Sequence, residues 1–421
     1  MMRTKSAILF AALSGALAGP PATFWGQASA QDAYFTEDNA SGVFTPRIDA
    51  GVVLRDADAG DTLLFDLDAE LEYETFSHAG RRWGWVLGGR IERDTARRGW
   101  GGLAGDCPAG AADCASVEAG GAPAPVTGPV SGFYTAGPAD RDQTRAVLDA
   151  AYLYTDTGWG ELRLGYGPGA ANLDTEGGPT AFRLSRADGG RINTSELTGA
   201  RTRNLTSGHD PKIVFQSIAL GQETSVGTLE GAFSYTPSVR VCGVDLCARE
   251  YGAAGRLTPL ADDVVEVSLR YALRRGSHEW AVSAGLAESR DATGRPDFEG
   301  ITTLDAGLSW RHGDWRAGAR WLRSDNGIAA GDRDYEAWSA SGGYETGPWL
   351  WTVEYAAFSD DLVHVDGQTW QASGSRLVGE RWLIGAGVQA SERREPLLLG
   401  GVRTVAERDR TTGFVELGWQ F

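Results

Sequence analysis

The chain has 421 residues and a formal net charge of −17 at pH 7, which argues against nucleic acid as a partner because an acidic surface repels phosphates. It contains 58 glycines and 15 tryptophans but only two methionines. This composition argues against a helical bundle and favours β structure with many tight turns.

The first thirty residues have the three parts of an export signal. Arg3 and Lys5 give a charged start, residues 7–18 are apolar, and Ala28-Ser29-Ala30 forms a small-residue cleavage site. We therefore predict a cleaved signal peptide over 1–30 and a mature chain beginning at Gln31. A short N-terminal helix of the folded protein is the alternative. The apolar stretch is too short for a transmembrane helix, and no later segment approaches 18 consecutive apolar residues.

Apolar and polar residues alternate along about sixteen later segments, as they do on a strand with one apolar face. The segment TLLFDLDAELEYE, residues 62–74, is the clearest example. Each run has roughly the ten residues that a tilted strand needs to cross an outer membrane. In chain order the runs lie at 44–55, 62–74, 82–92, 146–154, 161–167, 212–220, 228–235, 264–273, 279–287, 302–311, 314–322, 335–345, 348–356, 368–377, 381–390 and 411–421.

The connections between these runs alternate in length. Short turns are expected at 77–80, 157–160, 274–278, 312–314 and 346–348. Long connections are expected at 94–143, 168–211, 236–262, 289–300, 324–334, 357–367 and 391–410. The pattern predicts an all-β fold, a transmembrane antiparallel β-barrel of about 16 strands with long extracellular loops and short periplasmic turns. A soluble propeller is the alternative, but no blade repeat is present.

The last run, TTGFVELGWQF, places large apolar residues on one face and polar residues on the other. Val415, Leu417, Trp419 and Phe421 share a face, whereas Glu416 belongs to the opposite face together with Phe414, Gly418 and Gln420. Tryptophans and tyrosines near the ends of the runs are expected to form the two interfacial girdles of the barrel. We therefore expect the first face to contact lipid and the second to contact water.

Four cysteines are expected to form two disulfides in an exported protein. Cys107 with Cys114 and Cys242 with Cys247 are the local pairings, although four cysteines allow three connectivities. Neither spacing is C-x-x-C and no histidine lies near either pair, which argues against a zinc site.

The export signal, the strand count, the run GWGELRLGYG at 158–167 and the terminal GFVELGWQF together resemble the general diffusion porins of Gram-negative bacteria, particularly the alphaproteobacterial type. The segment RTRNLTSGHDPKIVFQS resembles the stretch with which that family enters its next strand. The resemblance implies that the third long loop, 168–211, folds into the lumen and narrows the channel. The long loop at 94–143, with its cysteine pair, departs from the family pattern.

The resemblance also implies partners and a location. A porin of this type is a homotrimer in the outer membrane, where it contacts lipid and lipopolysaccharide. The barrel assembly machinery would read the C-terminal strand through Trp419 and Phe421. Outward-facing small residues such as Ala317, Ala319 and Ala386 would let barrels approach closely.

Charged residues on the inward face are the candidate lining of the channel. Side chains on a strand alternate between its two faces, so residues that alternate with the lipid-facing ones point into the lumen. On the first five predicted strands the inward-facing arginines are Arg47, Arg55, Arg82, Arg90, Arg145 and Arg163. The acids of the predicted constriction loop are Asp174, Glu176, Asp188, Glu196 and Asp210. We expect these acids to face Arg47, Arg90, Arg145 and Arg163 across the channel and create a transverse field.

A second group of lining residues is an acidic column on one strand. Its members are Asp66, Asp68, Glu70, Glu72 and Glu74. Five acids at a spacing of two repel one another unless neighbouring strands supply cations. With the net charge, the column predicts a mild preference for cations.

These features predict an outer-membrane porin through which small hydrophilic solutes and ions diffuse passively. A substrate-specific channel for sugars or anions is the runner-up, although inward-facing aromatic residues are few. A barrel enzyme is the third reading, but the five histidines are scattered and no H-E-x-x-H or G-x-S-x-G motif is present. We expect no catalytic site, cofactor or metal centre. Loosely bound Ca²⁺ at Asp56, Asp58 and Asp61 is possible by spacing, but a polar hairpin tip explains these residues better.

Overall fold

The computed structural model describes most of the chain after residue 41. The described residues are 42–56, 62–77, 80–94, 117–119, 122–124, 130–131, 143–222, 226–239, 241–242, 245–246, 261–292, 294, 298–329, 333–379, 381–399 and 402–420. The predicted signal peptide, Cys107, Cys114, Cys247 and Phe421 lie outside these residues, as do the side chains of Arg145 and Cys242. Most of the 94–143 loop and the Asp58 and Asp61 positions also lie outside them.

One antiparallel sheet of seventeen strands forms the wall. Two of them, β8 and β9, pair with the same neighbour and make up one interrupted crossing, so the barrel has sixteen crossings. The strands of the wall are β1 (Val43–Arg55), β2 (Leu63–Phe76), β3 (Arg82–Asp94), β6 (Gln143–Asp156), β7 (Gly160–Tyr166), β8 (Pro211–Ser217), β9 (Leu220–Gln222), β10 (Gly227–Val239), β13 (Ala261–Arg275), β14 (His278–Arg290), β15 (Thr302–His312), β16 (Trp315–Ser324), β17 (Tyr335–Thr346), β18 (Trp349–Asp360), β19 (Val365–Val378), β20 (Trp382–Leu399) and β21 (Val402–Gln420).

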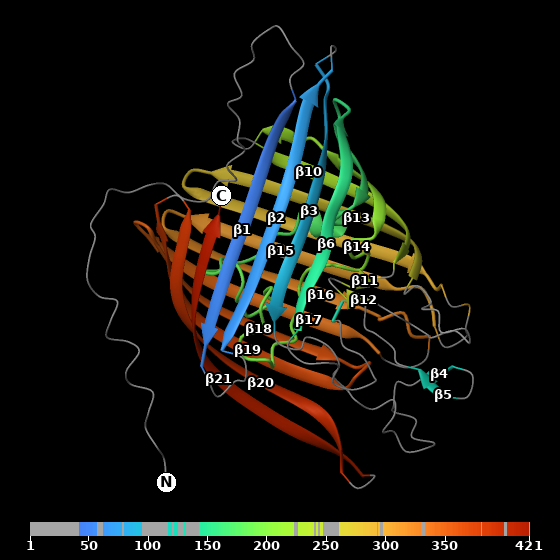
Figure 1. Ribbon diagram of the computed structural model, residues 1–421, viewed down its shortest axis with the longest axis vertical. Helices are drawn as coiled ribbons and strands as arrows, with labels where there is room; N and C mark the ends of the chain where they lie inside the picture. Colours follow the sequence, from blue (N-terminus) through green and yellow to red (C-terminus); the bar gives the residue numbers. More distant parts are fainter. Residues whose placement is uncertain are drawn as a thin grey trace.

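The first and last strands close the barrel. β1 pairs with β2 on one side and with β21 on the other, and Trp419 lies opposite Ala50 in the second pairing. Figure 1 shows β1 between β2 and β21 on the near side of the barrel. Because no strand edge is left unpaired at this seam, the backbone amides and carbonyls of the wall are satisfied within the sheet. The predicted sixteen-stranded antiparallel barrel is thus confirmed.

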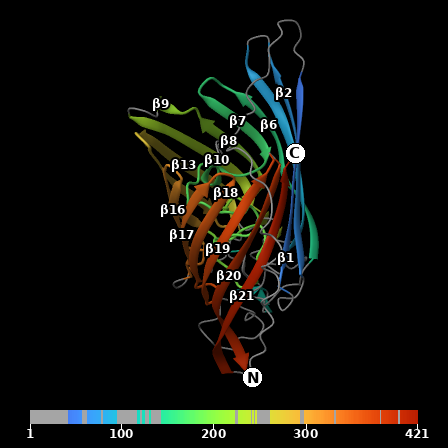
Figure 2. The ribbon, with the colours of Figure 1, turned by 90° about the vertical axis from the view of Figure 1, so that its left-hand side faces the viewer.

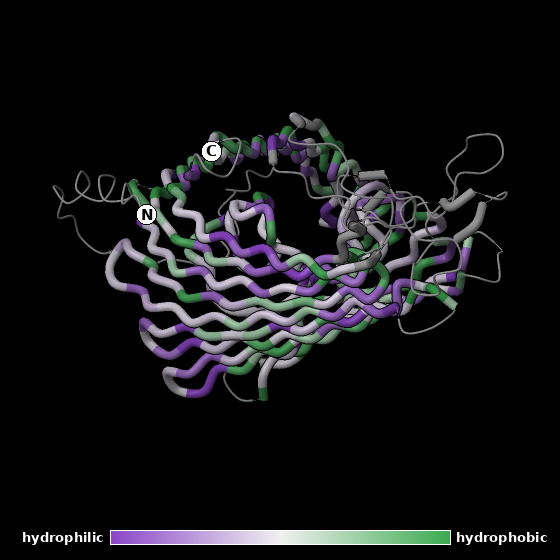
Figure 3. The backbone as a smooth tube through the Cα atoms, turned by 90° about the horizontal axis from the view of Figure 1, so that it is seen from below, coloured by the Kyte–Doolittle hydropathy of each residue, from purple (hydrophilic) through white to green (hydrophobic). Residues whose placement is uncertain are grey.

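Side chains alternate between the two faces of the wall as the period of two requires. Figure 3 shows hydrophilic and hydrophobic residues alternating along the strands. Trp419 of β21 packs near Trp382 of β20 on the outward face, with ring centroids 6.2 Å apart. Trp315 and Tyr344 form a similar outward pair, 4.8 Å apart. Both pairs lie at the short-turn ends of their strands, where one of the two interfacial girdles is expected.

Two of the predicted long connections are wrong. The expected loop at 391–410 is instead the end of a hairpin, because β20 and β21 continue to pair as far as Leu399 and Val402. Figures 1 and 2 show this dark red hairpin reaching beyond the neighbouring strands. Charged pairs such as Arg393 with Glu395, 3.0 Å apart, replace the apolar alternation there, so the hydrophobic pattern no longer reveals the strands. The expected loop at 357–367 shrinks to 361–364, because β18 and β19 continue to pair as far as Asp360 and Val365.

The remaining elements are small. Two short hairpins, β4 (Val117–Ala119) with β5 (Ala122–Ala124) and β11 (Val241–Cys242) with β12 (Asp245–Leu246), are separate from the main sheet. The helix α1 (Ala170–Leu173) has four residues. Within the described part of the chain, no helix has the length and hydropathy to cross a bilayer.

Candidate channel constriction

Residues 168–210, between β7 and β8, run along the inner face of the wall. In Figures 1 and 2 this green segment lies between the blue strands of one wall and the orange and red strands of the other. Its backbone amides donate to inward-facing hydroxyls on three strands spaced around the wall. Ala170 donates to Ser234 of β10 at 2.9 Å, and Glu176 donates to Ser283 of β14 at 2.8 Å. Ala181 donates to Thr352 of β18 at 3.2 Å, so hydrogen bonds hold the segment at intervals around the wall.

The far end of this segment is held by a single buried carboxylate. Glu416 of β21 accepts backbone N–H groups from Arg183, Leu184 and Ser185, each at 3.0 Å. Three successive amides pointing at one carboxylate form a strong, charge-assisted anchor. Glu416 thus faces inward as its parity predicts, but it contacts the segment instead of open water.

An apolar cluster beside this anchor also holds the segment to the wall. Phe182 packs edge-on against Phe414 of β21, with ring centroids 5.2 Å apart. Val53 and Leu64 from β1 and β2 join them, together with Leu184, Ile192 and Ala181 of the segment. Phe414 shares its face with Glu416, so the sequence pattern placed it towards water. The segment covers it, which explains why an apolar residue occurs on the inward face.

The two ends of the segment meet at one buried lysine. The ammonium group of Lys212 donates to the carbonyl oxygens of Gly167 at 2.8 Å, Ser207 at 3.3 Å and Gly208 at 2.6 Å. Glu266 of β13 accepts from the amide of Ser207 at 3.3 Å. Lys212 therefore joins the residues where the segment leaves the wall and where it returns.

Two of the predicted loop acids contact the wall on β8, β13 and β15. Asp174 accepts from Gln216 at 2.9 Å and from Ser268 at 3.2 Å. Glu176 accepts from Arg270 at 2.6 Å and from Ser309 at 2.5 Å.

The other three predicted acids have different surroundings. Asp210 is buried close to Lys212, where the segment returns to the wall. Glu196 bridges Arg55 of β1 and Arg410 of β21, at 2.7 and 2.8 Å. Asp188 is buried and accepts from Thr202 at 2.9 Å and from Ser339 of β17 at 3.1 Å. Burial opposes the ionisation of Asp188, but the guanidinium groups of Arg186, Arg320 and Arg203 outweigh it and hold its pKa below the ordinary value.

The three members of the predicted basic wall whose side chains the structure describes, Arg47, Arg90 and Arg163, pair with acids of their own strands. Arg47 pairs with Asp49 at 2.8 Å, and Arg163 pairs with Glu161 at 2.5 Å. Arg90 lies 3.3 Å from Glu92. In each pair the two residues are two apart on one strand, so they share a face and meet without help from the loop. Glu176 and Glu196 contact Arg270, Arg55 and Arg410. That the loop acids face Arg47, Arg90, Arg145 and Arg163 across the channel stays a prediction.

The acidic column of β2 meets arginines of the loop, which the sequence reasoning missed. Arg191 contacts Asp66 at 2.9 Å and Asp68 at 2.8 Å. Arg183 lies 2.9 Å from Asp49 of the neighbouring strand. The run RLSRADGGR at 183–191 carried the signal, since three arginines in nine residues stand out beside the loop acids.

The rest of the acidic column lies towards the short turns. Glu72 accepts from the hydroxyl of Tyr154 at 2.6 Å, and Glu74 lies 3.4 Å from Arg82. Glu70 is half-buried on the same face. On this side of the lumen the wall formed by β2, β3, β6 and β7 thus carries the acidic column together with Arg82, Arg90 and Arg163, which pair with its carboxylates or with those of neighbouring positions.

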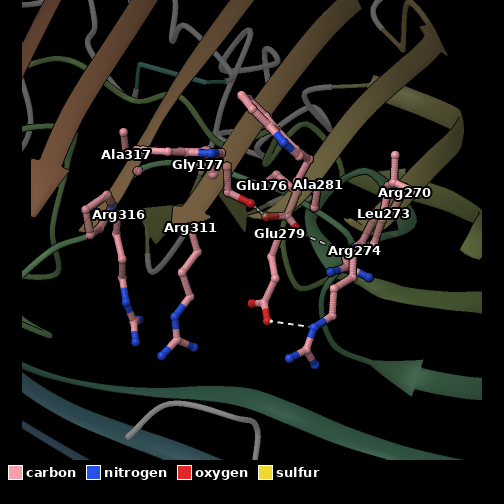
Figure 4. Close-up of a pocket in the computed structure, with 16 residues that line it drawn as sticks. Glu176, Gly177, Arg270, Leu273, Arg274, Glu279, Ala281, Arg311, Arg316 and Ala317 are labelled. Carbon is pink, nitrogen blue, oxygen red and sulfur yellow. Dashed lines mark hydrogen bonds and ion pairs between the residues drawn. The ribbon is translucent and has the colours of Figure 1, made fainter. Parts of the chain in front are cut away.

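Arginines occupy the part of the inner wall formed by β13, β15 and β16. They line a cavity of about 510 Å³ below the loop residues 176–179, together with Glu176 and Glu279. The arginines are Arg270, Arg274, Arg311 and Arg316. Figure 4 shows the side chains of Arg274, Arg311 and Arg316 projecting in one direction, away from their own strands and towards the blue and green strands. The sequence reasoning missed this row because it counted arginines only on the first five strands.

A buried histidine near the end of the segment predicts a pH effect. The ring of His209 lies 2.9 Å from the carbonyl oxygen of Asp149, and burial, with Lys212, Arg90 and Arg191 nearby, lowers the pKa of His209 to about 4. A detached segment would bind the proton at the ordinary pKa of 6.5, so acidification between these values favours detachment. We expect amide exchange at 207–210, corrected for intrinsic rates, to rise between pH 7 and pH 4.5. The same rise in His209→Gln would contradict this assignment.

The comparisons with known proteins agree with this geometry. Residues 6–396 match the family model described as Gram-negative porin. This chain belongs to the Gram-negative porin family. The match extends over most of the sequence, so the porin is an outer-membrane channel protein, as its sequence predicts. No curated protein matches the chain.

Solved structures show the same fold at low identity. The porin is 10% identical to OmpT (in-vitro folded), an outer membrane protein of Vibrio cholerae, with a TM-score of 0.51 over 92% of this chain and 100% of that one. A trimer form of OmpT gives 10% identity and a TM-score of 0.50, covering 90% of this chain and 100% of that one. The anion-selective porin from Comamonas acidovorans gives 14% identity and a TM-score of 0.49, covering 90% and 99%. Among the described residues of the porin, no group of His, Cys, Asp and Glu could hold a metal ion.

Proposed function

We propose that this porin lets small hydrophilic solutes and ions diffuse passively across the outer membrane, without catalysis, and that residues 168–211 narrow the channel. The observation that carries the proposal is the separation of charge across the lumen. Arg274, Arg311 and Arg316 line one wall, and Glu70 and Glu72 belong to the acidic column of β2. A transverse field of this kind orients dipolar solutes and disfavours apolar ones.

We further propose a mild preference for cations. The net charge of −17 and the carboxylates of β2 support it, because a negative lumen concentrates cations. In planar bilayers under a KCl gradient, we expect stepwise, long-lived openings and a modest cation-selective reversal potential. Openings that one particular sugar or anion blocks would instead favour a substrate-specific channel. Hydrolytic activity with no openings would favour an enzyme.

Neutralising the acidic column should reduce this selectivity. The double variant Glu70→Gln and Glu72→Gln removes two lumen charges, so we expect the reversal potential to move towards zero. Glu392→Gln with Glu407→Gln is the matched control. These two carboxylates lie on the protruding hairpin and belong to the face that points away from the lumen. An equal change in both double variants would contradict the assignment of selectivity to the column.

We propose a homotrimer in contact with outer-membrane lipid and lipopolysaccharide. A concave outer surface of about 800 Å³ over β14–β19 supports close approach, since small residues such as Ala317, Ala340 and Gly342 form its floor. OmpT of V. cholerae, which shares the fold, has been solved in a trimer form. A monomer on light scattering in mild detergent would contradict the trimer. Recognition of the C-terminal strand by the barrel assembly machinery, and the two local disulfides, remain predictions.

A further inference from the structure

Three arginines surround one carboxylate on the inner side of the constriction segment. Arg186 lies 3.1 Å from Asp188, and Arg320 of β16 lies 3.8 Å from it. Arg203 is the third, because its guanidinium group is close enough to lower the pKa of Asp188. Thr202 and Ser339 already donate to the same carboxylate. Asp188 is the carboxylate that all three arginines share, while Glu176 and Asp305 also lie near Arg320 and Glu354 lies near Arg186.

Two of these guanidinium groups have unused donors. Nε of Arg186 and Nη1 of Arg320 are buried and have no hydrogen-bond partner. Both lie within ion-pair distance of Asp188 but lack hydrogen-bond geometry towards it. The side chain of Arg320 is only 8% exposed, while its Nε donates to the carbonyl oxygen of Glu176 at 2.6 Å. Buried N–H groups are rarely left unpaired in a folded protein, so these donors point to a missing acceptor.

Arg203 completes the site from the lumen. Its neighbours Thr202 and Asn204 are buried against the wall, where Asn204 donates to Asp305 of β15 at 3.1 Å. Because residues on either side face the wall, the exposed side chain of Arg203 projects towards the lumen. No ion-pair or hydrogen-bond partner of Arg203 occurs among the described residues. A solute that passes the segment therefore meets a free guanidinium group before the two buried ones.

We propose that Arg186, Arg203 and Arg320 form a binding site for small oxyanions, represented by inorganic phosphate. Planar guanidinium groups match pairs of phosphate or carboxylate oxygens, and an oxyanion would supply acceptors to the unused N–H groups. The site rests on the proposed function only for its access route through the lumen. It retains oxyanions locally inside a channel whose overall charge favours cations.

The test compares wild-type porin with Arg203→Gln. In KCl at constant ionic strength and pH, phosphate should reduce the single-channel current saturably in the wild type. Losing a charge-assisted contact of roughly 1.5–3 kcal/mol corresponds to at least about a tenfold weaker apparent affinity for phosphate in Arg203→Gln. Arg47→Gln is the control, because Arg47 is an inward-facing arginine that pairs with Asp49 away from the site. It should keep the wild-type affinity.

Calorimetric titration of phosphate into the folded barrel in detergent separates this inference from the proposed function. It requires no ion flow, so binding without openings would sustain the site and refute the diffusion channel. Openings without saturable phosphate binding would refute the site and leave the channel standing. Equal affinity in wild type and Arg203→Gln would also overturn the assignment.

Discussion

Replacing Lys212 by Met is expected to release the base of the constriction segment and increase the current noise of single channels. The variant leaves the carbonyl oxygens of Gly167, Ser207 and Gly208 without their donor. Removing one partner from a buried charged network costs about 3–5 kcal/mol. The segment should fluctuate between attached and detached states, which can be measured as rapid steps in conductance and as larger solutes passing in liposome swelling.

The chemistry of this position is unusual for the chain. The sequence contains two lysines, Lys5 and Lys212, and all other basic residues except histidine are arginines. A compact ammonium group can direct three donors at three converging carbonyl oxygens, whereas a planar guanidinium group cannot. Lys212→Arg should therefore also raise the noise, although it keeps the charge.

The control for Lys212 is Arg81→Met, which removes an exposed cation beside a short turn. It should leave current noise and solute size limit unchanged. If Lys212→Met gives quiet channels of wild-type conductance, while the barrel still shifts on heating in gel electrophoresis, the assigned role of Lys212 is wrong.

Glu416→Gln is expected to free the far end of the same segment. The carboxylate accepts three backbone N–H groups, and an amide in its place turns one acceptor into a donor that faces an amide hydrogen. The loss should be about 3 kcal/mol, since hydrogen bonds to charged groups contribute roughly 1.5–3 kcal/mol each. We expect faster hydrogen exchange at the amides of Arg183, Leu184 and Ser185, and a higher unit conductance.

Glu407→Gln provides the matched change on the same strand, because Glu407 is exposed and belongs to the outer face, opposite to that of Glu416. Its exchange rates at 183–185 should equal those of the wild type. Equal exchange in the two variants would show that Glu416 does not hold the segment. The neighbouring contact of Phe182 with Phe414 should keep the barrel closed in either case.

Much of the fold could be predicted because a strand crossing a membrane must alternate residue by residue. In β2 and β21, residues two positions apart face the same side of the wall. Leu67, Asp68 and Trp419 could therefore be assigned to the correct faces from the sequence. Prediction from the alternating pattern failed for strand segments outside the membrane, because no lipid there requires one apolar face. Beyond the apolar band, β20 and β21 carry charges on both faces, and their pairing depends on the partner strand.

The sequence alone therefore determined the class of fold, the crossings and the face of most wall residues, because those depend on local spacing and on the lipid around the barrel. Only the tertiary structure decided which charges meet. The path of residues 168–210 brings Arg191 to Asp68 and Glu196 to Arg55, which are separated by more than a hundred residues. Many arginines and carboxylates could have formed such pairs, and their pairing energies are similar. The choice among them depends on where Glu416, Lys212 and the apolar cluster hold the segment against the wall.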